Sequence, residues 1–64
     1  MGQFCKDYEI RLHRPDGKLS LVAVVSAVSE IDARRQAESF LTERLTNAFI
    51  WRDGQLVDAL YKLN

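Results

Sequence analysis

The sequence predicts an α+β domain of order β-β-α-β-β, in which one helix packs on one face of a four-stranded sheet. Three observations predict this class. A segment near the N-terminus alternates apolar and polar residues, each half of the chain has an Asp-Gly pair between two apolar segments, and the middle of the chain has helical periodicity. All 64 residues are expected to form one domain, with strands at about 7–14, 19–28, 47–52 and 55–61 and a helix at about 30–46.

The first predicted hairpin joins a half-buried strand to a fully apolar one. Residues Tyr8–His13 alternate apolar with polar side chains, which is typical of a strand with one buried face. Pro15, Asp16 and Gly17 predict the turn, because proline fixes φ and glycine adopts the left-handed conformation. Residues Leu19–Val28 follow as an apolar, β-branched run without alternation. Such a run is typical of a strand covered on both faces, so we expect it near the middle of the sheet.

The predicted helix has a clear start signal and one apolar stripe. Ser29 is a favourable N-cap residue, and Glu30 and Asp32 complement the helix dipole in the first turn. The stripe consists of residues that recur at helical spacing: Ala33, Ala37, Phe40, Leu41 and Leu45. Its two alanines predict that the first half of the helix lies close to the sheet. Asn47 is expected to lie just beyond the helix end.

Asp53 and Gly54 predict a tight second hairpin, because both central residues of a type I′ turn need positive φ. The pairing register decides which side chains share a face. With a two-residue loop, one face carries Phe49, Trp51, Leu56 and Leu60, and the other carries Ala48, Ile50, Val57, Ala59 and Tyr61. A three-residue loop shifts the pairing by one and groups Ala48, Ile50, Leu56 and Leu60 instead. Under either register both faces keep large apolar side chains.

The two hairpins supply apolar side chains on both sides of the sheet, whereas one helix covers only one side. Exposed apolar patches of a few hundred Å² mark interaction sites in soluble proteins. We therefore expect a homodimer, formed through the uncovered sheet face or the edge strands. The predicted interface residues are Phe49, Trp51, Leu56 and Leu60, and Trp51→Ala is expected to weaken association more than Arg35→Ala. Alternatively, Phe4, Leu63 and the chain ends fold over the second face within one copy.

The small size of the chain also favours self-association. Domains below roughly 70–80 residues usually need a disulfide, a metal or an oligomer in addition to their core. Cys5 is the only cysteine and His13 the only histidine, so neither an intrachain disulfide nor a metal site is expected. Oligomerisation is the remaining means of stabilisation, and no cofactor is predicted.

The sequence does not predict an enzyme. A nucleophile and its base must lie within hydrogen-bond reach, whereas Cys5 lies near the N-terminus and His13 lies beside a turn. The carboxylates are scattered over the predicted turns and strands without a paired spacing. The predicted function is therefore a non-catalytic protein-interaction module of unknown biological role, which self-associates.

Two alternative functions remain open. One is a small inhibitor or adaptor of the phage or plasmid type, which binds another protein through Trp51 or an edge strand. The other is binding of single-stranded nucleic acid, with Phe49 and Trp51 stacking on bases beside Arg11 and His13. The nine basic and nine acidic residues cancel, which removes a general attraction to nucleic acid or to anionic membranes.

The sequence also predicts a cellular location. No apolar run is long enough to span a bilayer, so no contact with a membrane is expected. The N-terminal residues lack the apolar segment of a signal peptide. A cytoplasmic location, in which the single thiol stays reduced, is therefore predicted.

Overall fold

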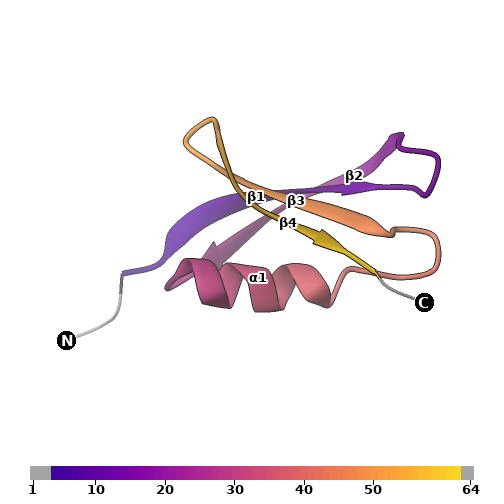
Figure 1. The fold of residues 1–64 in the computed structure, drawn as a ribbon. Helices are drawn as coiled ribbons and strands as arrows, with labels where there is room; N and C mark the ends of the chain where they lie inside the picture. The colour runs from indigo at the N-terminus through magenta and orange to yellow at the C-terminus, as the bar shows by residue number, and fades with distance from the viewer. Residues whose placement is uncertain (1–3, 63–64) are drawn as a thin grey trace.

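The computed structural model describes residues 4–62, which form one antiparallel sheet and one helix (Figure 1). The elements are β1 (Lys6–His13), β2 (Leu19–Ala27), α1 (Glu30–Glu38), β3 (Asn47–Arg52) and β4 (Gln55–Tyr61). The strand order is β2-β1-β3-β4, and α1 lies across one face of the sheet. The predicted α+β class and the β-β-α-β-β order are confirmed.

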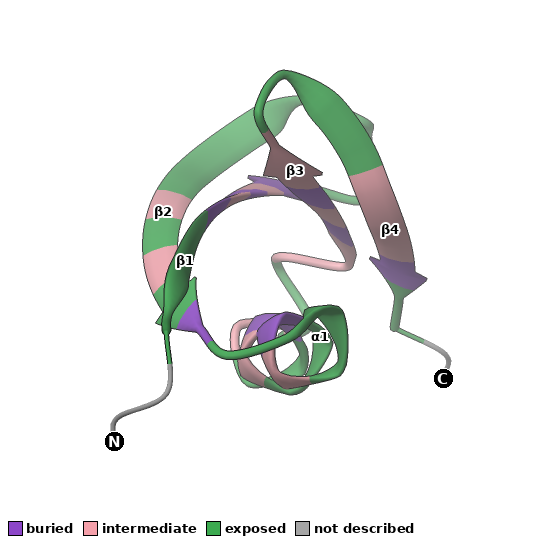
Figure 2. Cartoon of the chain, turned by 90° about the vertical axis from the view of Figure 1, so that its left-hand side faces the viewer, coloured by how far each residue is buried: buried purple, intermediate pink, exposed green. Residues whose placement is uncertain are grey.

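The core lies between α1 and the concave face of the curved sheet (Figure 2). Alternate residues of β1 point into it, as predicted, because Tyr8, Ile10 and Leu12 are at most 2% exposed. Ala33 and Ala37 of α1 are completely buried, which confirms the close approach that two alanines predict. The remaining buried side chains come from the other three strands: Ala27, Ala48, Ile50 and Leu60.

β2 lies at an edge of the sheet, so the prediction that Leu19–Val28 lies near the middle is wrong. β1 is central instead, because it pairs with β2 on one side and with β3 on the other. After α1 the chain returns to the free side of β1, where Ile50 lies opposite Ile10. The apolar side chains of β2 therefore lack the cover that their pattern predicts.

α1 ends at Glu38 rather than near residue 46, where the prediction placed its end. Ser39 is the C-cap residue, and its hydroxyl donates to the carbonyl oxygen of Gln36 at 2.6 Å. The N–H groups of Phe40 and Leu41 bond to carbonyl oxygens three residues back, which tightens the last turn. The regular helix therefore stops halfway along the predicted apolar stripe.

Thr42 accounts for this early end. Its Oγ1 accepts hydrogen bonds from the N–H groups of Arg44 (3.2 Å) and Leu45 (3.1 Å), and its own N–H donates to the carbonyl oxygen of Leu45. A threonine that bonds to nearby backbone in this way competes with helix formation. Phe40, Leu41 and Leu45 still pack against the core from the non-helical segment. The stripe therefore predicts the burial correctly and the backbone conformation wrongly.

An ion pair holds α1 to β4 beside the core. Arg34 Nη1 donates to Asp58 Oδ2 at 2.7 Å, and the N–H of Ala59 donates to Asp58 Oδ1 at 2.8 Å. The hydrogen bond from Arg34 lowers the pKa of the Asp58 carboxyl below its usual value, and this effect outweighs the opposing effect of partial burial. The pair therefore links the edge strand β4 to the exposed side of the helix.

Both predicted turns adopt the backbone that their residues favour. Gly54 has a φ of 76° and Asp53 a φ of 52°, so both central residues are left-handed, as a type I′ turn requires. Gly17 has a φ of 89° in the first turn. These three positions confirm the two turn predictions.

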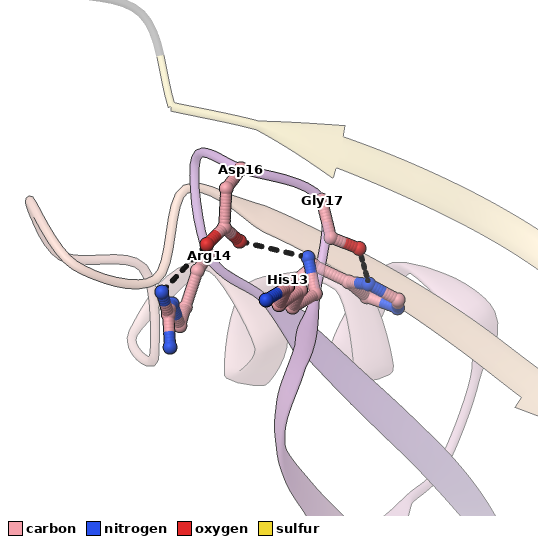
Figure 3. Close-up of polar contacts among 5 residues, drawn as sticks. His13, Arg14, Asp16 and Gly17 are labelled. Atoms are coloured by element: carbon pink, nitrogen blue, oxygen red, sulfur yellow. Dashed lines mark hydrogen bonds and ion pairs between the residues drawn. The ribbon is translucent and has the colours of Figure 1, made fainter.

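Side-chain contacts reinforce the first turn (Figure 3). The N–H of Gly17 donates to the carbonyl oxygen of Arg14 at 2.8 Å. Asp16 accepts from the Arg14 guanidinium at 2.5 Å and from the N–H of Lys18 at 2.9 Å. His13 Nδ1 lies 2.9 Å from the carbonyl oxygen of Gly17. The histidine therefore belongs to the turn as well as to β1.

The second hairpin combines both predicted registers, because β4 contains a bulge at Val57. Next to the turn, Trp51 lies opposite Leu56, as in the register of a two-residue loop. Beyond the shift, Ala48 lies opposite Leu60, as in the register shifted by one. The extra residue changes which side chains of β4 face the core.

Candidate interaction surface

The face of the sheet opposite α1, which we call the outer face, is convex, and no element of residues 4–62 covers it (Figure 2). It carries the residues of β1, β2 and β3 that alternate with core residues, together with the residues of β4 that pair with them. The following large apolar side chains on this face are roughly half exposed or more: Leu19 (53%), Val22 (47%), Val24 (67%), Leu56 (50%) and Tyr61 (59%). Phe49 and Trp51 lie on the same face and are only partly exposed. The outer face is therefore the candidate interaction surface.

Three of the four predicted interface residues lie together on the outer face. Phe49 and Trp51 alternate with buried residues along β3, and Leu56 lies opposite Trp51 on β4. Tyr61 lies on the same face at the other end of β4. We call these four residues (Phe49, Trp51, Leu56 and Tyr61) the outer patch.

Leu60 does not belong to the outer patch. It lies opposite Ala48 on the core side of the hairpin and is 4% exposed. The bulge at Val57 is the cause, because one extra residue moves the following side chains to the other face. The prediction that Leu60 shares a face with Trp51 is wrong.

The aromatic rings of the outer patch contact side chains of the same chain. Phe49 meets His13 edge to face at 5.0 Å between ring centroids, and it meets Tyr61 edge to face at 6.2 Å. The guanidinium of Arg11 lies 4.7 Å from the centroid of the Trp51 ring, in a cation–π contact. One face of the Trp51 ring is therefore occupied by Arg11 rather than open to a nucleic-acid base.

A row of polar side chains from β1 crosses the middle of the outer face. Asp7, Glu9, Arg11 and His13 alternate along β1 with its core residues. Arg11 Nε donates to the carboxylate of Glu9, and Ser26 Oγ on β2 donates to Asp7 Oδ1 at 3.0 Å. This row separates the outer patch from the apolar side chains of β2.

β2 presents a second apolar surface, which sequence reasoning missed. Four of its large apolar side chains are exposed, namely Leu19, Leu21, Val22 and Val24. No charged residue occurs anywhere between Leu19 and Ser29. The apolar run predicts a strand inside the sheet of one copy. The same pattern also fits a strand that becomes internal when two copies meet.

A small hollow of about 220 Å³ lies on the outer face beside the second turn. Asp7, Glu9 and Asp53 line it together with Arg11 and Trp51. The buried indole N–H of Trp51 has no acceptor within residues 4–62. Because the lining carries charges of both signs, the hollow does not select a ligand of either charge.

The remaining candidate residues do not form a second site. Phe4 is 88% exposed and therefore does not cover the outer face, and Leu63 lies outside the described residues. Cys5 is an exposed free thiol that precedes β1, whereas His13 ends that strand. Within residues 4–62, no three His, Cys, Asp or Glu side chains are placed to hold a metal ion.

Comparisons with known proteins found no relative. No protein-family model matches the chain, and neither a curated protein nor a solved structure matches it. In the described part of the chain, no helix has the length and apolar character to cross a membrane. A functional proposal for this chain therefore rests on its own residues.

Proposed function

We propose that this chain is a non-catalytic protein-interaction module that associates with a second copy of itself. The observation that supports this is the uncovered outer face, which carries half-exposed Val22, Val24, Leu56 and Tyr61 on its two edge strands. These residues form two exposed apolar patches, one on each side of the charged row of β1, and exposed apolar patches mark interaction sites in soluble proteins. A twofold pair is the commonest closed assembly of identical chains.

The small core also supports the proposal. Four of the nine buried core residues within residues 4–62 are alanines: Ala27, Ala33, Ala37 and Ala48. A buried Val, Leu, Ile or Phe side chain contributes about 1.5–3 kcal/mol, and an alanine methyl contributes much less. A chain of 64 residues with such a core gains stability if a second copy covers part of its apolar surface.

The solution mass tests the proposal. Sedimentation equilibrium and light scattering are expected to show a mass that rises from 7.4 kDa toward twice that value between low micromolar and submillimolar concentration. The measurement uses the full chain, in reducing buffer to prevent disulfide formation by Cys5. A constant monomer mass at the highest concentration would remove the proposed function.

The outer patch is one candidate surface for this contact. Trp51 is a residue type that often dominates interfaces, and it lies between the half-exposed Leu56 and the ring of Phe49. If the outer patch carries the contact, Trp51→Ala raises the dissociation constant more than Arg35→Ala, which changes an exposed residue of α1. Equal dissociation constants for the two variants would exclude the outer patch.

A further inference from the structure

We propose that the two copies join edge to edge through β2, antiparallel and about a twofold axis beside Val22. The product is one continuous sheet of eight strands, because each copy contributes four. This inference rests on the proposed self-association and names the surface that performs it. Four observations support β2 over the outer patch.

The two edges of the sheet differ in their protection. Natural edge strands are usually protected by charges, proline or bulges. β4 has two such features, the bulge at Val57 and the charged Asp58. β2 is longer, contains neither charge nor proline, and is irregular only at Ser20, next to the turn. An unprotected apolar edge of this length is a template for another strand.

A hydrogen bond from α1 limits the free part of this edge. Gln36 Nε2 donates to the carbonyl oxygen of Ser26 at 2.9 Å, which leaves the stretch Leu19–Val25 open. The middle of that stretch is Val22. An axis there places Val22 opposite its own copy and Leu21 opposite Ala23 of the second copy, and both Leu21 and Ala23 lie on the core side of β2. Paired residues of antiparallel strands point to the same face, so both helices lie on one side of the joined sheet.

The outer face is less suited to packing against a second outer face. It is convex, because the sheet bends around α1 (Figure 2), and two convex surfaces touch over a small area. Its middle row carries Asp7, Glu9 and Arg11. The centres of protein interfaces are depleted of charged residues, because burial of charges is unfavourable unless every charge is paired. Edge pairing leaves these groups in water.

The charges at the two ends of β2 are complementary. Lys18 precedes the strand, and Glu30 begins the helix that follows it. Both side chains are exposed, and neither has an ion-pair partner within residues 4–62. Antiparallel pairing about the axis at Val22 places Lys18 of each copy near Ser26 of the other, at the end of β2 that leads to Glu30. A parallel pairing of the two β2 strands would instead bring like charges together, which is unfavourable.

Single-cysteine cross-linking tests the geometry. In a Cys5→Ser background, Val22→Cys is expected to form an intermolecular disulfide under mild oxidation, because residues paired across antiparallel strands have the Cα separation that a disulfide needs. Leu56→Cys is the matched control, since Leu56 is equally exposed (50% against 47%) and lies on the other edge strand. At least a fivefold higher yield of cross-linked dimer at position 22 is expected.

A charge placed on the edge provides the second measurement. Val24→Lys is expected to raise the dissociation constant at least tenfold, because each copy then carries a lysine on the edge strand that has to pair, and such charges oppose strand addition. Leu56→Lys and Trp51→Ala are expected to leave the dissociation constant within about twofold. Far-ultraviolet circular dichroism confirms that each variant is folded. If Val24→Lys does not fold, the cross-linking of Val22→Cys and Leu56→Cys still tests the edge pairing.

The outcomes separate this inference from the proposed function. A wild-type chain that stays monomeric overturns both. A dimer that cross-links through Leu56 at least as well as through Val22, or that Trp51→Ala dissociates more than Val24→Lys does, retains the self-association and overturns the edge pairing.

Discussion

Asp58 connects solution pH to the attachment of the helix. The hydrogen bond from Arg34 lowers the pKa of this carboxyl in the folded chain. A carboxyl whose folded pKa is lowered contributes stability above its unfolded pKa, about 3.9, and loses that contribution as the pH falls through its folded pKa. The side chains of Arg34 and Asp58 are 49% and 35% exposed, so solvent screens the pair and limits it to about 0.2–1 kcal/mol.

We predict that Asp58→Asn lowers the free energy of unfolding by about 0.2–1 kcal/mol at neutral pH. The difference is expected to vanish once the pH has fallen below the lowered pKa of the Asp58 carboxyl. Urea unfolding, followed by the fluorescence of Trp51, measures both values. Asp53→Asn is the control, because its side chain is 84% exposed and asparagine also tolerates positive φ. A difference between the wild type and Asp58→Asn that persists in acid would contradict the assigned ion pair.

Residues with strong local preferences were predictable from the sequence. Gly17 and Gly54 adopt positive φ because few other residues do so without strain. Ser29 caps α1, since its Oγ accepts from the N–H of Asp32 at 3.2 Å. These outcomes depend on a few neighbouring atoms, so the surrounding fold does not alter them.

At the scale of elements, the close contact between α1 and the sheet depends on small side chains. Ala33 and Ala37 are completely buried, and a larger side chain at either position has no free volume to occupy. Overpacking of a core position costs typically about 1–3 kcal/mol. A domain with so small a core has little stability to lose.

We predict that Ala37→Leu lowers the free energy of unfolding by about 1–3 kcal/mol. Arg35→Leu introduces the same side chain at an exposed position of α1 and is expected to change stability by less than about 0.5 kcal/mol. Thermal unfolding of the two variants at equal concentration makes the comparison. Equal midpoints would show that the helix lies further from the sheet than the structure places it.

The end of α1 and the bulge in β4 could not be predicted from local pattern. Phe40, Leu41 and Leu45 keep helical spacing and are partly buried, but Thr42 between them bonds to the backbone of its own turn. Leu60 faces the core because a single extra residue at Val57 shifts the register. Both outcomes depend on a competition between nearby structures that hydrophobic spacing does not resolve.

At the scale of the whole molecule, an apolar pattern indicates how much cover a strand needs and not which neighbour provides it. The run Leu19–Val28 has the composition of an internal strand, yet β1 takes that position because it pairs on both sides. The interface prediction at Phe49, Trp51 and Leu56 locates residues on the uncovered face, and their role in association stays a proposal. The exposed edge of β2 follows from the strand order, which the apolar pattern does not determine.

We predict that the unfolding temperature rises with protein concentration, because folding and association are coupled in the proposed dimer. Each tenfold increase adds about 1.4 kcal/mol per dimer, or about 0.7 kcal/mol per chain. For a domain of this size, that corresponds to roughly 3–6 °C. Differential scanning fluorimetry measures the unfolding temperature at low protein concentration, and calorimetry measures it at high protein concentration. A midpoint independent of concentration in samples whose mass is dimeric would show that the monomer is stable without its partner.

The bulge at Val57 also limits how far assembly can proceed. A sheet whose two edge strands could both pair with another copy would add copies indefinitely and grow into fibrils. Here the edge formed by β4 has a bulge at Val57 and carries Asp58, and both features oppose the addition of a further strand. In the proposed dimer both β2 edges are paired, so we expect growth to stop at two chains and the protein to remain a discrete particle when it is concentrated.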